Sequence, residues 1–144
     1  MASNEIRERG HRAKRRYTKR ERARQEEETR LRITEATMKL HRTVGPANTT
    51  VSEVARLAGV GRMTVYNHFP TDAKLIEACS THWITLNPLP DSGAWAAIED
   101  PQQRLAVALG ELYEWYGNTE DMMGKVIRDA PIVPALGEVM SESW

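Results

Sequence analysis

Residues 49–69 decide the fold of this chain and read Thr-Thr-Val-Ser-Glu-Val-Ala-Arg-Leu-Ala-Gly-Val-Gly-Arg-Met-Thr-Val-Tyr-Asn-His-Phe. Thr50 and Glu53 have the spacing of a capping box, in which a hydroxyl and a carboxylate satisfy free amides at a helix start. Apolar residues then recur at i, i+3, i+4 and i+7, on one face of a helix: Val51, Val54, Ala55 and Ala58. Gly59 is expected to end this helix, because glycine adopts a positive φ without a Cβ clash.

A second short helix is predicted to start at Arg62, with Gly61 as its cap. Val65 and Phe69 are four residues apart and are expected to face inward. Two short helices joined by a glycine turn are typical of a helix-turn-helix, whose second helix enters the major groove of DNA. On this pattern alone, a helical hairpin inside an ordinary helical protein remains the alternative.

The outer face of the second helix carries side chains suited to base edges. Arginine donates two hydrogen bonds to guanine, asparagine pairs with adenine, and methyl groups pack on thymine. The predicted base contacts are Arg62, Met63, Thr64 and Asn67. Hydroxyl, imidazole and ammonium donors nearby suit phosphate oxygens, which fix the register without reading sequence. The predicted phosphate contacts are Thr49, Thr50, Tyr66, His68 and Lys74.

The segment Gly-Val-Gly-Arg-Met-Thr-Val-Tyr-Asn-His-Phe-Pro (59–70), with Thr-Thr-Val-Ser-Glu-Val-Ala before it, resembles the tetracycline-repressor (TetR) family of bacterial regulators. The resemblance covers about residues 31–83. It implies an all-α fold: a three-helix DNA-binding head, a linking fourth helix and a helical ligand-binding body. It also implies a homodimeric repressor that a small-molecule effector releases from a double-stranded DNA operator.

Two residues depart from the pattern of that family. Gly61 stands where a capping serine is common, and Asp72 stands where a lysine is common. The resemblance implies a phosphate contact at the second position, which a carboxylate cannot make. Thr71 and Asp72 nevertheless suit the cap and the first turn of a fourth helix, expected over residues 72–86.

Charge and composition divide the chain into three regions. Residues 1–20 are polar, basic and without apolar periodicity, so they are expected to form a disordered arm. The arm either lies along DNA or is merely solvated. A head over residues 21–70 and a partial ligand-binding body over 71–144 follow. Residues 1–30 carry a net charge of +5, residues 31–84 carry +2 and residues 85–144 carry −7, an asymmetry expected when one end meets phosphate.

Apolar periodicity predicts the remaining helices. The buried face of the first helix is expected to hold Leu31, Ile33, Ala36, Leu40 and Val44. A fifth helix is expected from the Asp100 cap to a stop at Gly117, and a sixth from a Thr119 cap. The buried face of the fifth helix is expected to hold Leu105, Leu109, Leu112 and Tyr116.

Aromatic and methionine side chains of the body suit an apolar ligand pocket, although packing between helices explains them equally well. The candidate pocket residues are Trp83, Tyr113, Trp115, Tyr116, Met122 and Met123. The C-terminal dimerisation helices usual in the resembled family are not apparent. A helical module that binds a protein partner is therefore the second hypothesis.

The sequence disfavours catalysis, cofactor binding and membrane insertion. The four histidines, at 11, 41, 68 and 82, lack metal-ligand spacing, and no phosphate-loop or nucleophile motif is present. No apolar run approaches the roughly 20 residues of a membrane span. With a single cysteine and no secretory signal, the expected location is the bacterial cytoplasm.

Overall fold

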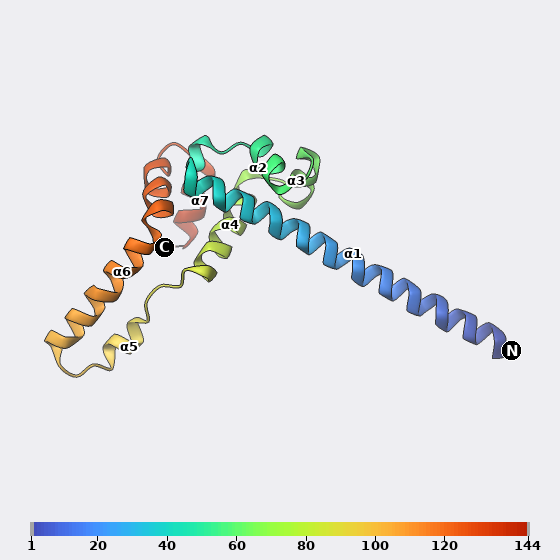
Figure 1. Cartoon of the computed structure of the whole chain (residues 1–144), viewed down its shortest axis with the longest axis horizontal. Helices are drawn as coiled ribbons and strands as arrows, with labels where there is room; N and C mark the ends of the chain where they lie inside the picture. The colour runs from blue at the N-terminus through green and yellow to red at the C-terminus, as the bar shows by residue number, and fades with distance from the viewer. Residues whose placement is uncertain (1, 144) are drawn as a thin grey trace.

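The computed structural model describes the backbone of residues 2–143 and the side chains of residues 8, 9 and 11–141. All regular elements in this described part are helical (Figure 1), which confirms the predicted all-α fold. In chain order they are α1 (Ala2–Thr43), the 3-10 turn η1 (Pro46–Asn48), α2 (Val51–Ala58), α3 (Arg62–His68), α4 (Asp72–Leu86), α5 (Ser92–Ala96), α6 (Pro101–Asp129) and α7 (Pro134–Ser143).

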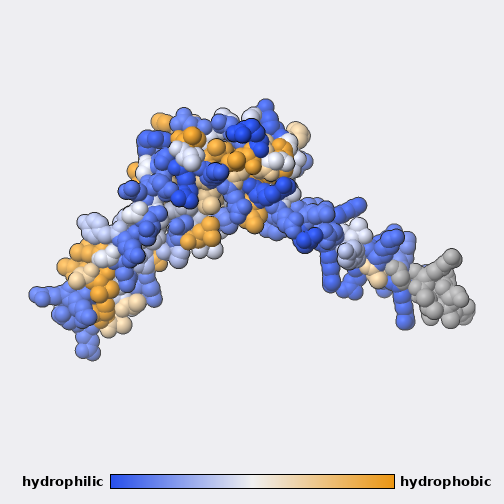
Figure 2. Space-filling view, viewed as in Figure 1, coloured by the Kyte–Doolittle hydropathy of each residue, from blue (hydrophilic) through white to orange (hydrophobic). Residues whose placement is uncertain are grey.

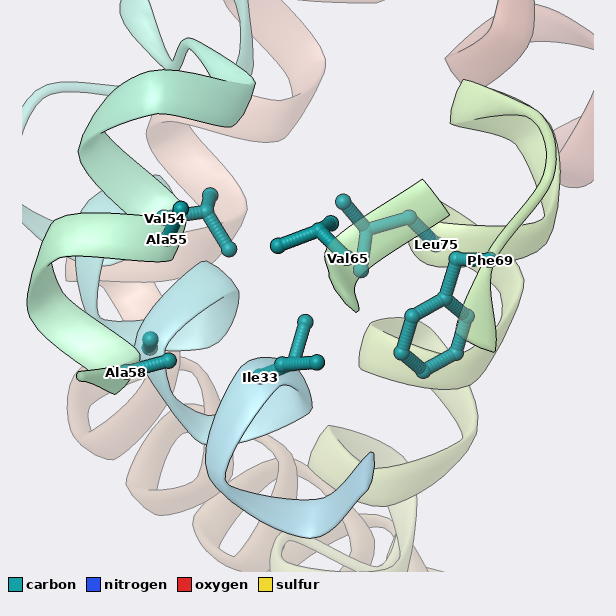
Figure 3. Packing of buried hydrophobic residues seen from close by; sticks show 8 residues of the cluster. Ile33, Val54, Ala55, Ala58, Val65, Phe69 and Leu75 are labelled. Carbon is teal, nitrogen blue, oxygen red and sulfur yellow. The ribbon is translucent and has the colours of Figure 1, made fainter. Parts of the chain in front are cut away.

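The hydrophobic core of the head lies where α1, α2, α3 and α4 meet (Figure 3). Ile33, Val54, Val65 and Phe69 are at most 2% exposed. Burying each such side chain contributes about 1.5–3 kcal/mol. The small residue Ala55 lets the neighbouring helices approach α2 closely. This core fixes the orientation of α3, since Val65 of the helix and Phe69 directly after it are both buried in it.

Local signals set the ends of α2 as the sequence predicts. The amide of Glu53 donates to Thr50 Oγ1, and the amide of Thr50 donates to Glu53 Oε2, both over 3.2 Å. At the other end, Gly59 has φ 69°, in the left-handed region that favours glycine. The capping box and the glycine stop are both confirmed.

The body is built from α4, α6 and α7, with α5 against the distal part of α6 (Figure 1). The inward face of α4 holds Leu75, Ile76, Cys79 and Trp83, as predicted. Asp100 caps α6 by accepting the amides of Gln102 and Gln103. Because α4 runs from the head into the body, the two parts share one helix.

The first half of α1 differs from the expected disordered arm. Residues 2–20 are helical, and the predicted boundary between arm and head falls inside this 42-residue helix. Figures 1 and 2 show it extending away from the rest of the molecule. The physical reason is composition, because arginine, lysine, glutamate and alanine are all strong helix formers. Arg24 adds ion pairs with Glu21 and Glu28 at helical spacing.

Two residues of the predicted α1 face are not buried. Ile33 and Ala36 enter the core and Leu40 is half-buried, but Leu31 and Val44 are 43% and 42% exposed. Leu31 lies where α1 begins to leave the head. Val44 follows the last residue of the helix, so the helical period no longer places its side chain.

The expected break between a fifth and a sixth helix is absent, since α6 runs unbroken from Pro101 to Asp129. A single helical glycine costs only about 1 kcal/mol relative to alanine, so Gly117 does not stop the helix. Thr119 does not cap; its hydroxyl donates to the Trp115 carbonyl over 2.7 Å.

The predicted buried face of α6 is also largely wrong. Leu105, Leu109 and Tyr116 are 60%, 44% and 55% exposed. The periodicity correctly marks an apolar face, but most of the first half of α6 lies beyond α4 and α7 and packs mainly on α5. Figure 2 shows the resulting apolar patch at the α5–α6 end of the molecule.

Candidate nucleic-acid interface

Helix α3 presents a mixed polar and apolar surface to solvent. Arg62, Met63 and Asn67 are exposed and Thr64 is half-buried, while Val65 faces the core. The Met63 side chain is 72% exposed and therefore accessible to a ligand. All four predicted base-reading residues therefore lie on an accessible part of α3.

The start of α3 is capped by backbone alone. Gly61 occupies the cap position without a side-chain hydrogen bond, and its carbonyl accepts the amides of Thr64 and Val65. This confirms the predicted helix start at Arg62. It also means that no cap side chain lies between the first turn and solvent, so an approaching backbone meets little obstruction.

Some of the predicted phosphate contacts share a groove with Arg62. One open hollow is lined by α2, α3 and α4 on one side and by residues 133–138 on another, and it includes Thr49, Thr50, Arg62 and Tyr66. The Thr49 hydroxyl donates to the Gly45 carbonyl and the Thr50 hydroxyl to Glu53 Oε2, each over 2.8 Å. Both hydroxyls must exchange these partners before they can donate to phosphate.

Charge around this groove is mixed. Asp72 lines it, so its carboxylate opposes the approach of a phosphate. Lys74 lies outside the groove, and its ammonium is 2.8 Å from Glu77 on the same helix. His68 also lies outside, at the C-terminal end of α3. The structure thus separates the five predicted phosphate contacts into a groove set and two outlying residues.

Arg30 helps to hold α3 in place, a role that the sequence patterns did not predict. Its Nη1 donates to the His68 carbonyl over 3.1 Å, and its guanidinium lies 4.3 Å from the centroid of the Phe69 ring. These contacts hold the C-terminal end of α3 against α1. Its place one turn before Ile33 was the only signal of this role in the sequence.

Residues 33–79 match the bacterial regulatory proteins of the tetR family. The matched stretch starts at the first core residue of α1 and ends in α4, so it includes the whole helix-turn-helix. Residues 33–79 thus form a tetR-family DNA-binding domain. The chain is accordingly a DNA-binding transcriptional regulator. None of the curated proteins compared with the chain matches it.

Two further features of the described residues concern membranes and metal ions. None of the described helices of this tetR-family chain is both long and apolar enough to cross a membrane. Within the same residues, no three His, Cys, Asp or Glu side chains gather in a way that could hold a metal ion.

The head of this tetR-family regulator is joined to the body by a buried carboxylate. Asp129, 1% exposed, accepts the Ala47 amide over 3.0 Å and the Arg128 guanidinium over 2.6 Å. Arg128 and these hydrogen bonds hold the pKa of Asp129 below its usual range. Gly45 has φ 94°, and a Cβ there would collide with both α6 side chains.

A second link lies nearby, where Arg42 donates twice to Asp121 Oδ2 over 2.9 and 2.6 Å. The Arg42 hydrogen bonds lower the pKa of the Asp121 carboxyl. Both links join the end of α1 or the η1 turn to α6. They connect residues about 80 positions apart, so no local pattern in the sequence predicts them.

A partly open apolar cavity of about 190 Å³ lies between α4, α6 and α7. Five of the six predicted pocket residues line it: Trp83, Trp115, Tyr116, Met122 and Met123. Tyr113 does not; it is 75% exposed. The polar lining consists of His41, Ser80 and Asn87. Among the described residues, no acidic residue, lysine or arginine lines the cavity.

His41 and Cys79 meet at the wall of the cavity, with Nδ1 3.7 Å from Sγ. Burial lowers the pKa of His41 to about 4, although the Asp129 carboxylate opposes the shift. Burial also raises the pKa of the Cys79 thiol to about 12. Both groups are therefore neutral at pH 7 and present hydrogen-bonding atoms without charge. His82 lies outside the lining, with Nε2 3.9 Å from Glu35.

Proposed function

We propose that this tetR-family protein is a repressor that binds an operator through α3 and is released when a small molecule fills the body cavity. One observation carries the proposal: α4 lines the cavity with Cys79 and Trp83 and begins three residues after α3. A ligand that alters the position of α4 would therefore shift the head. Release requires that the ligand bind the two positions with different affinities.

The operator is contacted in two ways in this proposal. Arg62, Met63, Thr64 and Asn67 read base edges, and Thr49, Thr50, Tyr66, His68 and Lys74 hold phosphates. The exposure of the α3 surface supports the first set, and the groove beside it supports part of the second. The bacterial cytoplasm, where the DNA lies, is the proposed location.

The effector is expected to be neutral and largely apolar. Two tryptophans, a tyrosine and three methionines line the cavity, and its polar atoms come from uncharged groups. A charged ligand would lose its hydration without gaining an opposite charge. The cavity is smaller than the roughly 300–1,000 Å³ of drug-sized sites, so a ligand of one or two rings fits best.

A homodimer completes the proposal. Two heads must lie about 34–36 Å apart to read successive major grooves. Leu105, Leu109, Tyr113 and Tyr116 form an exposed apolar face on α6, which supports self-association there. We refer to these four residues as the α6 apolar face.

Selection of bound sequences from a random duplex library tests this function directly. Enrichment of a palindrome whose half-sites lie one helical turn apart is expected, and loss of binding on adding a small aromatic ligand would support release. Recovery of no enriched sequence at low salt would contradict the proposal.

The α6 apolar face also favours a second candidate function, a helical module that binds a protein partner. A measurement of mass in solution with a duplex-binding assay separates the two functions. A dimer with operator affinity supports the repressor, whereas a monomer without DNA affinity supports the interaction module.

A further inference from the structure

Seven basic side chains gather on one face of the exposed half of α1. Arg9, Arg12, Arg16 and Lys19 follow at i, i+3, i+7 and i+10, which aligns them along a helix of 3.6 residues per turn. Three further basic residues lie at the edges of this row: Arg15, Arg20 and Arg22. We call these seven residues the α1 basic face. No acidic residue lies between Arg9 and Arg20.

These charges are not neutralised within the part of the chain that the structure describes. Every one of the seven side chains is exposed, and none has a hydrogen bond or ion pair to another described residue. Arg24 on the same helix differs, since Glu21 and Glu28 hold it at 2.6 and 3.1 Å. Like charges at i+3 and i+4 destabilise a helix, so a polyanion that covers this face would relieve the repulsion. Figure 2 shows this half of α1 as a hydrophilic rod against which no other helix packs.

The position of the basic face is set by the head. Arg30 fastens α1 to the His68 carbonyl and the Phe69 ring, at the C-terminal end of α3. Arg22 lies eight residues earlier, which is about 12 Å along the helix. Because α1 is unbroken, the direction of the basic face follows from the orientation of α3.

Duplex DNA fits this surface better than an acidic protein does. Seven charges from Arg9 to Arg22 span about 20 Å of helix, and a duplex presents one negative charge per about 1.7 Å of its axis. The acidic body of a second copy is the other source of negative charge on this chain. Several of its carboxylates are already engaged: Asp121 by Arg42, Asp129 by Arg128 and Glu111 by the Trp95 indole.

We propose that the α1 basic face binds the phosphate backbone of the same duplex that α3 reads, an inference that rests on the proposed function. The contact is independent of base sequence and adds to affinity and to its salt dependence. A helix about 10–12 Å wide does not enter a minor groove about 6 Å wide, so α1 lies along the backbone.

The test compares two double variants of the full chain that remove equal charge from α1. Arg12→Ala/Arg16→Ala changes the basic face, and Lys14→Ala/Arg24→Ala changes residues outside it. Alanine preserves helix propensity in both. Affinity for a selected duplex is measured at several salt concentrations, and the slope of log K against log salt is compared.

For Arg12→Ala/Arg16→Ala, the slope is expected to fall by about 1–2 and the affinity at 0.1 M salt by about tenfold or more, because two phosphate contacts are lost. The loss should be equal for all sequences, with base preference unchanged. The control variant should retain the slope of the unmodified chain.

The other results would overturn the inference in recognisable ways. Equal loss in both variants would mean that only net charge matters. If both variants bind as tightly as the unmodified chain while Arg62→Ala still alters base preference, α1 makes no contact with DNA. The proposed function then stands without this inference. If the unmodified chain binds no duplex, both the α1 contact and the proposed function are wrong. Intact DNA affinity with loss of a salt-sensitive self-association would assign the face to the acidic body of a second copy.

Discussion

Neighbouring side chains of α3 differ in what they can recognise. Arg62 is exposed in the first turn, and Tyr66 lies four residues later on the same groove. A guanidinium distinguishes guanine by two hydrogen bonds, whereas a phenol hydroxyl on a phosphate reads no sequence. Substitutions at these positions are therefore expected to have different effects on specificity.

Arg62→Ala should relax the preference at one base pair, with a loss of about 1–3 kcal/mol there. Tyr66→Phe removes only the hydroxyl and should weaken binding to all sequences equally. Competition binding against operators altered at single positions measures both. If the two variants weaken every sequence alike, Arg62 is a phosphate contact, as its place in the groove with Thr50 would then explain.

Burial of His41 makes the stability of the fold sensitive to acid. Its pKa in the folded chain is about 4, below the roughly 6.5 of an unfolded histidine, so the unfolded state binds the proton first. Stability is therefore complete above about pH 6.5 and falls as the pH drops towards 4, by roughly 3 kcal/mol.

The free energy of unfolding at pH 7 and pH 5 measures this effect. His41→Gln should lose most of the difference between the two pH values, and His11→Gln, at an exposed position, should keep it. Persistence of the full difference in His41→Gln would assign the acid sensitivity to other groups.

Local and distant interactions explain which elements the sequence predicts. The capping box, the Gly59 stop and the start of α3 depend on residues close in the chain, and all are confirmed. The periodicity of Leu105 and Leu109 marks an apolar face correctly, but burial also depends on how far α4 and α7 extend. The Asp129–Ala47 bond joins elements that no local pattern connects. Five of the six predicted pocket residues line the cavity and Tyr113 does not, while the lining residues of α7, Leu136, Val139 and Met140, were not predicted because they lie on a distant helix.

The junction between η1 and α6 gives a prediction at the scale of elements. Gly45→Ala should destabilise the fold by about 1–3 kcal/mol, because φ is positive there and the new Cβ meets Arg128 and Asp129. Gly117→Ala is a matched control in open space within α6 and should stabilise by about 0.5–1 kcal/mol. Chemical denaturation measures both. If Gly45→Ala leaves the free energy of unfolding unchanged, the side chains of α6 do not restrict the turn at Gly45.

The whole molecule separates its functions along its length. The basic half of α1 lies at one end, the head and the cavity lie in the middle, and the α6 apolar face lies at the other end (Figures 1 and 2). A dimer formed through this end would leave both heads accessible. Linking two heads raises affinity by a high effective concentration, without any new DNA contact.

Leu109→Glu/Tyr113→Glu should convert the proposed dimer to a monomer and weaken operator binding by about 10²-fold or more. Gln103→Glu/Gly110→Glu is a control with the same added charge on α6 outside this face. Light scattering measures the mass, and duplex titration measures the affinity. A dimer that survives the first variant would place self-association on another surface.

The unbroken course of α1 has a mechanical consequence. Its last turn is tied to α6 through Arg42 and Asp121, and its other half projects freely. Arg9 lies 34 residues before Thr43, which corresponds to about 50 Å of helix. Over that length, a tilt of about 5° at the junction displaces the distal turns by about 4 Å. The helix thus acts as a lever that amplifies small rotations of the body, and a fluorophore at residue 11 would report effector binding with a larger movement than one on α3.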